Sequence, residues 1–349
     1  MILCANPSAQ FDSYQIEIEE AVLAVMRGNR YVLGEEVASL EKEFADYIGT
    51  ASAVGVANGT DAIELALRAL DIGLGDEVIT VSHTAVATIA AIEATGASAV
   101  LVDVESEYYT LNPEQLEEVF STKTRAIIAV HLYGQSANLD AIKDFCQIKN
   151  IFLIEDASQA HGAKYQGERL GSIGDFGCFS CYPTKNLGAI GDAGLITTNN
   201  IDLAAKARML REYGWNNRIS EYAGRNSRLD EIQAAVLRIK LKHLDSDNEK
   251  RRQLAKYYTD NLAESQVSTP VVRANVESVF HLFVLQVGQR QELLKYLLSN
   301  DIQAGVHYPV PVHLQPAYKG RISIASDMSV TEGLTDRIIS LPMYPELSM

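Results

Sequence analysis

The chain has 349 residues, of which 47% are apolar, so it can bury a large core and is expected to form two domains. Its formal net charge of -15 argues against nucleic acid and anionic membrane surfaces as partners, because both favour basic patches on a protein. No apolar run approaches the roughly 20 residues that span a bilayer, and the first ten residues contain no Lys or Arg, which predicts a cytoplasmic protein without a signal peptide.

Short apolar runs alternate with helical patterns between positions 53 and 198. Strands are expected at Ala53–Val56, Val78–Val81, Ala99–Val104, Ala126–Leu132, Ile151–Ile154, Phe176–Cys181 and Gly194–Thr197. Helical patterns lie between most of these runs, around 61–70, 84–95, 113–120 and 139–149. This alternation predicts an α/β fold with a mainly parallel sheet that is covered by helices on both faces.

The rest of the chain begins with a charged stretch from Leu229 to about Leu262, which is typical of a long helix that connects two domains and has its charges in solvent. We therefore expect a large domain with an N-terminal arm at 1–245 and a smaller C-terminal α/β domain at 246–349. Within the smaller domain, the segment Val279–Val287 alternates enough to be a strand.

The first candidate functional segment is Ala57–Asp61, directly before a helical pattern with apolar residues at 63, 66, 67 and 70. Gly59 and Thr60 stand at the start of that helix. Free backbone N–H groups and the positive end of the helix dipole make such a position suitable for a phosphate group. An Asn-Gly pair also marks an ordinary turn, so this segment alone does not decide between the two interpretations.

The second segment is Ile151–Gly162, in which Asp156 follows a run of apolar residues. Ligands of open parallel sheets bind at the carboxyl ends of the strands, so this side chain is expected to face a crevice. A carboxylate there can pair with a protonated ring nitrogen of a cofactor, and Gln159 can reach a ring oxygen. The alternative is that Asp156 only caps the next helix.

The third segment is Phe176–Gly194, in which Lys185 lies between an apolar strand and a glycine-rich turn, five residues after Ser180. A lysine beside small residues and a hydroxyl can bind an aldehyde cofactor covalently, while the hydroxyl helps to bind the cofactor's phosphate. Most single lysines are solvated surface charges, so the argument depends on the three segments together. Their order is a phosphate turn, an acid at a strand end and then a lysine.

Cys178 and Cys181 form a C-x-x-C pair, which raises the question of a metal or redox site. A structural zinc site needs four ligands, usually from two such pairs, and the sequence has no second pair. Residues three apart on a strand point to opposite faces of the sheet. We therefore predict no metal site and interpret both residues as small apolar side chains of a buried strand.

The chain resembles the sugar aminotransferases of the DegT/DnrJ/EryC1/StrS family from about Gly28 to its C-terminus. The resemblance is carried by the motifs Tyr31–Glu36, Asn58–Ala62, Gly73–Ile79, Val130–Gln135, Glu155–Gly162, Tyr182–Gly188, Asn226–Ala235 and Gly305–Tyr318. It implies a fold-type-I pyridoxal phosphate enzyme with a seven-stranded sheet in the large domain. It also implies a homodimer whose active sites lie at the subunit interface.

The resemblance assigns roles to matching residues. Lys185 corresponds to the lysine that binds the cofactor and moves protons, and Asp156 to the partner of the ring nitrogen. The other implied cofactor contacts are Gly59, Thr60 and Ser180 at the phosphate, Gln159 at the ring hydroxyl, and Asn226, which reaches the phosphate of the neighbouring subunit. Several relatives stack an aromatic residue on the ring where this chain has Ala85, so His83 is a candidate for that face.

The resemblance also indicates the substrates. The motif around Lys185 is most similar to the branch that acts at C-3 of dTDP-linked 3-keto-6-deoxyhexoses, with L-glutamate as amino donor and pyridoxamine phosphate as the intermediate form of the cofactor. Candidate sugar contacts are Tyr182, His307, Tyr308 and His313, although histidines without a role are the alternative for two of these. Candidates for the anionic nucleotide are Arg30, Arg218 and Arg225.

Other functions remain open at this point. A C-4 nucleotide-sugar or cyclitol aminotransferase uses the same apparatus. The related dehydratases carry histidine in place of the lysine, so Lys185 argues against that activity. A non-catalytic pyridoxal phosphate-binding regulator is a further alternative, although neither a basic patch nor an added DNA-binding segment is apparent.

Overall fold

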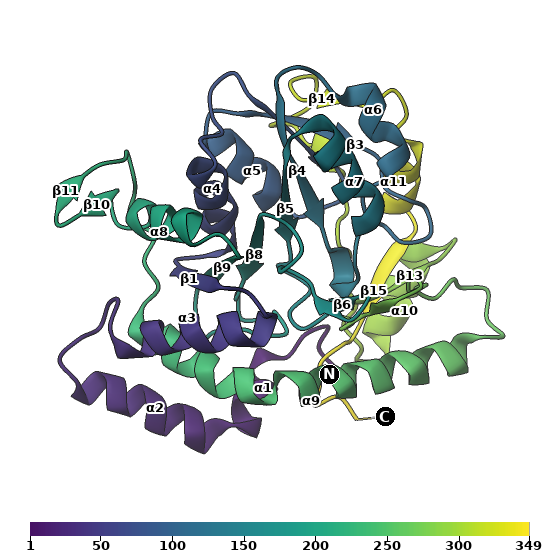
Figure 1. The fold of residues 1–349 in the computed structure, drawn as a ribbon. Coiled ribbons are helices and arrows are strands. Elements are labelled where there is room, and N and C mark those ends of the chain that lie inside the picture. The colour runs from purple at the N-terminus through teal and green to yellow at the C-terminus, as the bar shows by residue number, and fades with distance from the viewer. Residues whose placement is uncertain (349) are drawn as a thin grey trace.

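The computed structural model describes residues 1–348, and its centre is a large, mostly parallel sheet (Figure 1). The order of its strands is β1 (Ser52–Val56), β9 (Gly194–Thr198), β8 (Phe176–Ser180), β5 (Phe152–Asp156), β4 (Thr124–Val130), β2 (Glu77–Val81), β3 (Ser98–Val102) and β14 (Ser323–Ile324). Only β9 runs antiparallel to its two neighbours. The predicted fold class and all seven predicted strands of the large domain are confirmed, and β14 adds an eighth.

The helices that follow the strands cover the sheet. They are α4 (Gly59–Ala69), α5 (Val86–Ala94), α6 (Leu116–Val119), α7 (Leu139–Lys149) and α8 (Ile201–Leu210). Helix α4 packs on β8 and β9, and α7 packs on β4 and β5. Asn58 caps α4 by accepting a hydrogen bond from the Asp61 N–H at 2.8 Å, which fixes where the helix begins.

The long helix α9 (Glu231–Leu262) runs along the base of the molecule (Figure 1). It packs against α2 (Gln15–Arg27) and α3 (Glu35–Ile48), and the shorter α1 (Pro7–Ser13) precedes these two helices. The expectation that its charges are solvated is wrong for four residues, because Glu231, Lys240, Asp247 and Arg251 are all less than 5% exposed. A helix that is covered by the large sheet domain on one side and by N-terminal helices on another has little free surface.

The C-terminal part of the chain has a second, smaller core. Strands β13 (Phe283–Gln286) and β15 (Ile338–Leu341) pair antiparallel, and α10 (Arg290–Ser299) packs against β15. The predicted strand Val279–Val287 is therefore confirmed only in its second half, at β13. Its first part bends away, with Phe280 at a φ of 41° and the Val279 N–H bonded to the Gly134 carbonyl.

The proposed domain boundary at position 245 lies inside the continuous helix α9 and remains a prediction. Two segments of the C-terminal part return to the large sheet: β14 pairs with β3, and α11 (Ser329–Thr335) packs into the main core through Leu334. Small two-residue strands complete the structure at β6 (Lys164–Tyr165), β7 (Glu168–Arg169), β12 (Val276–Glu277), β10 (Trp215–Asn216) and β11 (Ile219–Ser220). No helix within residues 1–348 is long and apolar enough to cross a membrane.

Candidate active site

A pocket of about 280 Å³ lies at the carboxyl ends of β4, β5 and β8. The N-terminus of α4 and the start of α5 close two of its sides. The pocket brings together seven of the predicted site residues, namely Gly59, Thr60, Asp156, Gln159, Ser180, Tyr182 and Lys185. These residues come from positions far apart in the sequence, and the parallel arrangement of β4, β5 and β8 places them at one edge.

Lys185 sits in the loop that connects β8 to β9. The loop begins with a tight turn, in which the Lys185 N–H donates to the Tyr182 carbonyl at 2.8 Å. A Cβ at Gly188 would lie 2.5 Å from the Pro183 carbonyl oxygen, so the loop can close on itself only with glycine there. Burial of the amine lowers the pKa of Lys185 to about 8, against the opposing effect of Asp156, so about a tenth of the amine is free base at pH 7.

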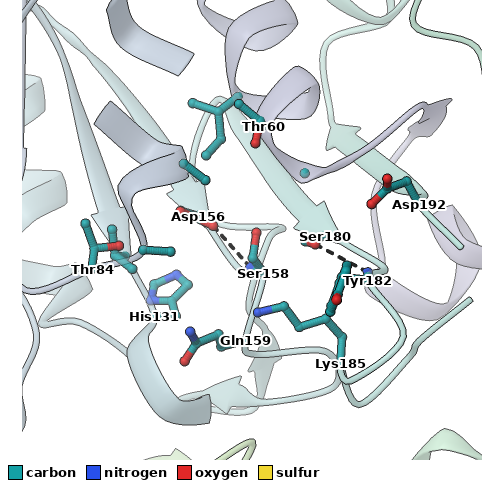
Figure 2. Close-up of a pocket in the computed structure, with 15 residues that line it drawn as sticks. Thr60, Thr84, His131, Asp156, Ser158, Gln159, Ser180, Tyr182, Lys185 and Asp192 are labelled. Carbon is teal, nitrogen blue, oxygen red and sulfur yellow. Dashed lines mark hydrogen bonds between the residues drawn. The ribbon is translucent and has the colours of Figure 1, made fainter. Parts of the chain in front are cut away.

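Asp156 is the last residue of β5 and is 6% exposed. The Thr88 hydroxyl donates to its Oδ2 at 2.9 Å, and the Ser158 N–H donates to its Oδ1 at 3.2 Å. No Lys, Arg or His nitrogen of residues 1–348 lies within 4.0 Å of this carboxylate. Figure 2 shows the amine of Lys185 extended into the space beside Asp156, Ser158 and Gln159. A buried carboxylate with hydrogen bonds but no cation is suited to receive a cationic group of a ligand.

The opposite end of the pocket is formed by the start of α4 and the end of β8. The two come so close that a Cβ at Gly59 would lie 2.5 Å from the Cβ of Ser180. The first N–H groups of a helix have no acceptor within the helix, and those of Gly59 and Thr60 belong to this set. Together with the Ser180 hydroxyl, they form a site with the character required for a phosphate group.

His131 also lines the pocket and was missed from the sequence. It directly follows β4, so the same signal that indicated Asp156, a polar residue at a strand end, applies to it. Its Nδ1 accepts the Ala137 N–H at 3.2 Å, which places the ring proton on Nε2, and Nε2 donates to Glu155 at 2.9 Å. The ring is fully buried and held in one orientation by these two bonds.

Glu155 fixes His131 and the loop that precedes β8. Its carboxylate is fully buried and accepts three backbone N–H groups, from Gly171, Ile173 and Gly174, each at 2.8 Å. Burial alone would raise the pKa of Glu155, but the hydrogen bonds from His131 and from the backbone hold it below its ordinary value. The stabilisation from this group is therefore present above about pH 4.5 and is lost as the pH falls through the depressed pKa.

Replacing Glu155 with glutamine should destabilise the protein by about 3 kcal/mol, because an amide cannot accept all four hydrogen bonds and buries a donor without a partner. Urea unfolding at pH 7 measures this change. At pH 3 the difference between the variant and the unsubstituted protein should shrink. An equal difference at both pH values would show that the ionised form of Glu155 is not what stabilises the fold.

The residues predicted from the C-terminal loop lie at different distances from the pocket. The Gln159 amide donates to the Tyr308 hydroxyl at 3.2 Å, so Tyr308 adjoins the pocket through its contact with a lining residue. His307 Nδ1 bonds with the Ser340 hydroxyl at 2.8 Å, and its carbonyl accepts from the Tyr133 hydroxyl. Burial, and then the charge of Lys185, lower the pKa of His307.

Two histidine expectations do not fit the structure. His313 is buried between the Ser82 hydroxyl at 2.7 Å and the Glu332 carboxylate at 3.1 Å, away from the pocket lining. His83 bonds with the Tyr133 hydroxyl at 2.7 Å. It does not line the pocket, where Thr84, Ala85 and Ala87 lie instead. Both histidines already have hydrogen-bond partners within the fold, which the sequence does not reveal.

Asn226 and the three candidate arginines lie outside the pocket of a single chain. Asn226 is exposed and accepts from Arg228 at 3.0 Å. Arg225 is paired with Glu64 and Asp61. Arg30 and Arg218 are exposed and do not line the pocket. None of these four residues is among those that line the pocket.

The sequence pattern of the DegT/DnrJ/EryC1/StrS aminotransferase family matches residues 12–349. A dTDP-3-amino-3,4,6-trideoxy-alpha-D-glucose transaminase of Streptomyces venezuelae is 44% identical over 97% of this chain and 90% of that protein. A dTDP-3-amino-3,6-dideoxy-alpha-D-galactopyranose transaminase of Aneurinibacillus thermoaerophilus is 45% identical over 96% of this chain and 92% of its own. The X-ray structure of S. venezuelae DesV in complex with a ketimine intermediate superposes with a TM-score of 0.97 at 42% identity, covering 99% of this chain and 94% of that one. The chain belongs to the DegT/DnrJ/EryC1/StrS aminotransferase family.

Proposed function

We propose that this protein is a pyridoxal phosphate-dependent aminotransferase that transfers an amino group from L-glutamate to C-3 of a dTDP-linked 3-keto-6-deoxyhexose. The observation that carries the proposal is that one pocket contains an enclosed amine, at Lys185, and a buried carboxylate without a paired cation, at Asp156. Family membership and the two 3-amino sugar transaminases among its relatives support the same activity.

The pocket fits the proposed cofactor at three points. Lys185 presents an amine for the aldehyde, Asp156 presents a carboxylate for the ring nitrogen, and the start of α4 presents N–H groups for the phosphate, beside Ser180. Gln159 lies between them with its amide directed toward Tyr308. When bound there, pyridoxal phosphate supplies an electron-withdrawing ring that stabilises negative charge on the substrate carbon.

The side chains of this chain perform the binding and the proton transfer. With its pKa lowered to about 8 by burial, Lys185 can both accept and return a proton at Nζ near neutral pH. Thr88 and Ser158 hold the Asp156 carboxylate in place, so its charge stays directed at one point of the pocket. Tyr182 is 53% exposed and lines the pocket, where it is suited to contact the sugar.

A homodimer is part of the proposal. The hairpin formed by β10 and β11 projects away from the body of the chain (Figure 1). It exposes apolar side chains, with Trp215 at 37% and Ile219 at 69%, and Asn226 lies at the base of the same segment. Association through this arm would cover these side chains and bring the Asn226 segment to the partner's pocket.

Absorption spectra and a pair of matched substrates test the proposal. The protein saturated with pyridoxal phosphate should lose its visible band when L-glutamate is added, and the resulting form should aminate a dTDP-3-keto-6-deoxyhexose. The dTDP-4-keto isomer is the matched control, and NMR of the product locates the new amine. Amination of only the 4-keto isomer would contradict the C-3 assignment, and a band that glutamate does not change would indicate a binding protein without turnover.

A further inference from the structure

Lys240 on α9 is a buried cation that has no part in the proposed reaction. It is 3% exposed, and no carboxylate oxygen of residues 1–348 lies within 4.0 Å of its amine. The amine instead donates to the Gly188 carbonyl at 2.7 Å and to the Gln10 Oε1 at 2.9 Å. A buried ammonium group destabilises a protein unless its hydrogen bonds are satisfied. The two acceptors of Lys240 therefore indicate which segments this residue holds together. One lies in the loop after Lys185, and the other lies in α1.

Helix α1 is held to the molecule by a polar contact. Gln10 is its one buried residue, so the helix has no apolar stripe facing the core. The Gln10 carboxamide accepts from Lys240 through Oε1, and through Nε2 it donates to the Asn186 carbonyl at 3.4 Å. The side chain therefore bridges α9 and the residue directly after Lys185. Helix α1 is therefore attached to the molecule at the loop that carries Lys185.

The Asn186 side chain is fixed by the same face of α9. Positions 240, 244, 248 and 251 of that helix follow its period, so they share one face, and the face is buried. From it, Asn248 accepts a hydrogen bond from the Asn186 Nδ2 at 2.8 Å. Asn186 also donates to the Val279 carbonyl at 3.1 Å and accepts from His281 Nδ1 at 3.1 Å. Its carboxamide is thus tied both to α9 and to the segment that leads to β13.

The N-terminal segment lies directly behind the loop that carries Lys185. Pro7 and Gln10 line one small pocket together with Pro183, Thr184 and Lys185. The same small pocket is also lined by Arg251 and by the C-terminal segment at Tyr344–Glu346. Helix α1 therefore lies next to the loop that carries Lys185, on the side that Gln10 contacts.

We propose that Lys240 and Gln10 form a positioning clamp for Lys185. The clamp holds the carbonyls of Asn186 and Gly188, on either side of Leu187, and with α1 it keeps the Lys185 amine directed into the pocket. Lys240 and Gln10 are positioning residues, because they touch the loop and not the reacting atoms. The inference rests on the proposed function only in taking Lys185 as the reactive amine.

Lys240→Met tests the clamp, with Lys242→Met on the exposed side of the same helix as the matched control. Hydrogen exchange is measured by mass spectrometry on the cofactor-free protein. In Lys240→Met, protection against hydrogen exchange should fall about tenfold in residues 7–14 and 182–190, because the charged donor to two acceptors is lost. Protection of β4 and β5 should not change. The dissociation constant for pyridoxal phosphate should rise about tenfold. Lys242→Met should change neither quantity.

Gln10→Ala keeps the inference testable if Lys240→Met does not fold, because it removes only one carboxamide from the short helix α1. It should loosen the same two segments, and the double variant should add little to either single change, since both residues act in one network. Unchanged protection of 182–190 in both single variants would overturn the clamp. Failure of the unsubstituted protein to bond pyridoxal phosphate at Lys185 would instead overturn the proposed function, while the exchange result would still stand.

Discussion

Replacing Lys185 with alanine should lower the transamination rate by about 10,000-fold or more. The variant lacks the amine that we propose bonds to the cofactor and moves the proton beside Asp156 and Gln159. Steady-state assay of the amination of a dTDP-3-keto-6-deoxyhexose measures the loss. The melting temperature should stay at or above that of the unsubstituted protein, because the substitution removes a buried amine whose ionisation is disfavoured by its surroundings.

Lys242→Ala is the control for this variant, since Lys242 is an exposed lysine of α9. It should retain full activity and an unchanged melting temperature. Full activity in Lys185→Ala would contradict the assignment of Lys185. A large drop in the melting temperature of Lys185→Ala would show instead that the residue has a structural role that its position in the pocket does not indicate.

Replacing Asp156 with asparagine should lower turnover by about 1,000-fold, because the neutral amide cannot stabilise a protonated ring nitrogen. The effect on stability should depend on the cofactor. Without it, the variant should melt at or above the temperature of the unsubstituted protein, since Asp156 is a buried carboxylate with no cation of residues 1–348 within 4.0 Å. With saturating pyridoxal phosphate, the rise in melting temperature should be smaller in the variant.

Asp144→Asn, at an exposed position of α7, controls for the change of an acid to its amide. It should leave both the rate and the rise in melting temperature unchanged. An equal rise in Asp156→Asn would mean that the Asp156 carboxylate does not contact the cofactor. A cofactor-free variant that is much less stable would mean that its hydrogen bonds with Thr88 and Ser158 stabilise the fold more than the buried charge destabilises it.

The large sheet could be predicted from the sequence because its strands are buried on both faces. Such strands are continuous apolar runs, and each predicted run contains an observed strand or overlaps one within two residues. Strand β14 is different: it has only two residues, Ser323 and Ile324, both exposed, so no pattern marks it. The segment Val279–Leu282 has the composition of a strand, but hydrogen bonds to the 133–134 turn bend it away.

The site residues on strand ends and helix starts could be predicted because chain direction alone places them at one edge of the sheet. This is why Asp156, Ser180 and Gly59 meet in one pocket with Lys185. Contacts between residues far apart in the sequence cannot be predicted in this way. His313 and His83 are similar to functional histidines in sequence, yet one ring nitrogen of each bonds to a distant residue, Ser82 for His313 and Tyr133 for His83. The burial of Lys240 likewise follows from packing that no local pattern specifies.

The central claim is a covalent bond between the Lys185 amine and pyridoxal phosphate, and borohydride reduction tests it most directly. The saturated protein is reduced, digested and mapped by mass spectrometry. We expect a single pyridoxyl group, on the peptide that contains Lys185. Lys240 is the informative competitor, because burial lowers the pKa of its amine to about 8 as well. A label on Lys240 or elsewhere, or no label at all, would contradict the assignment of Lys185 and the reaction that depends on it.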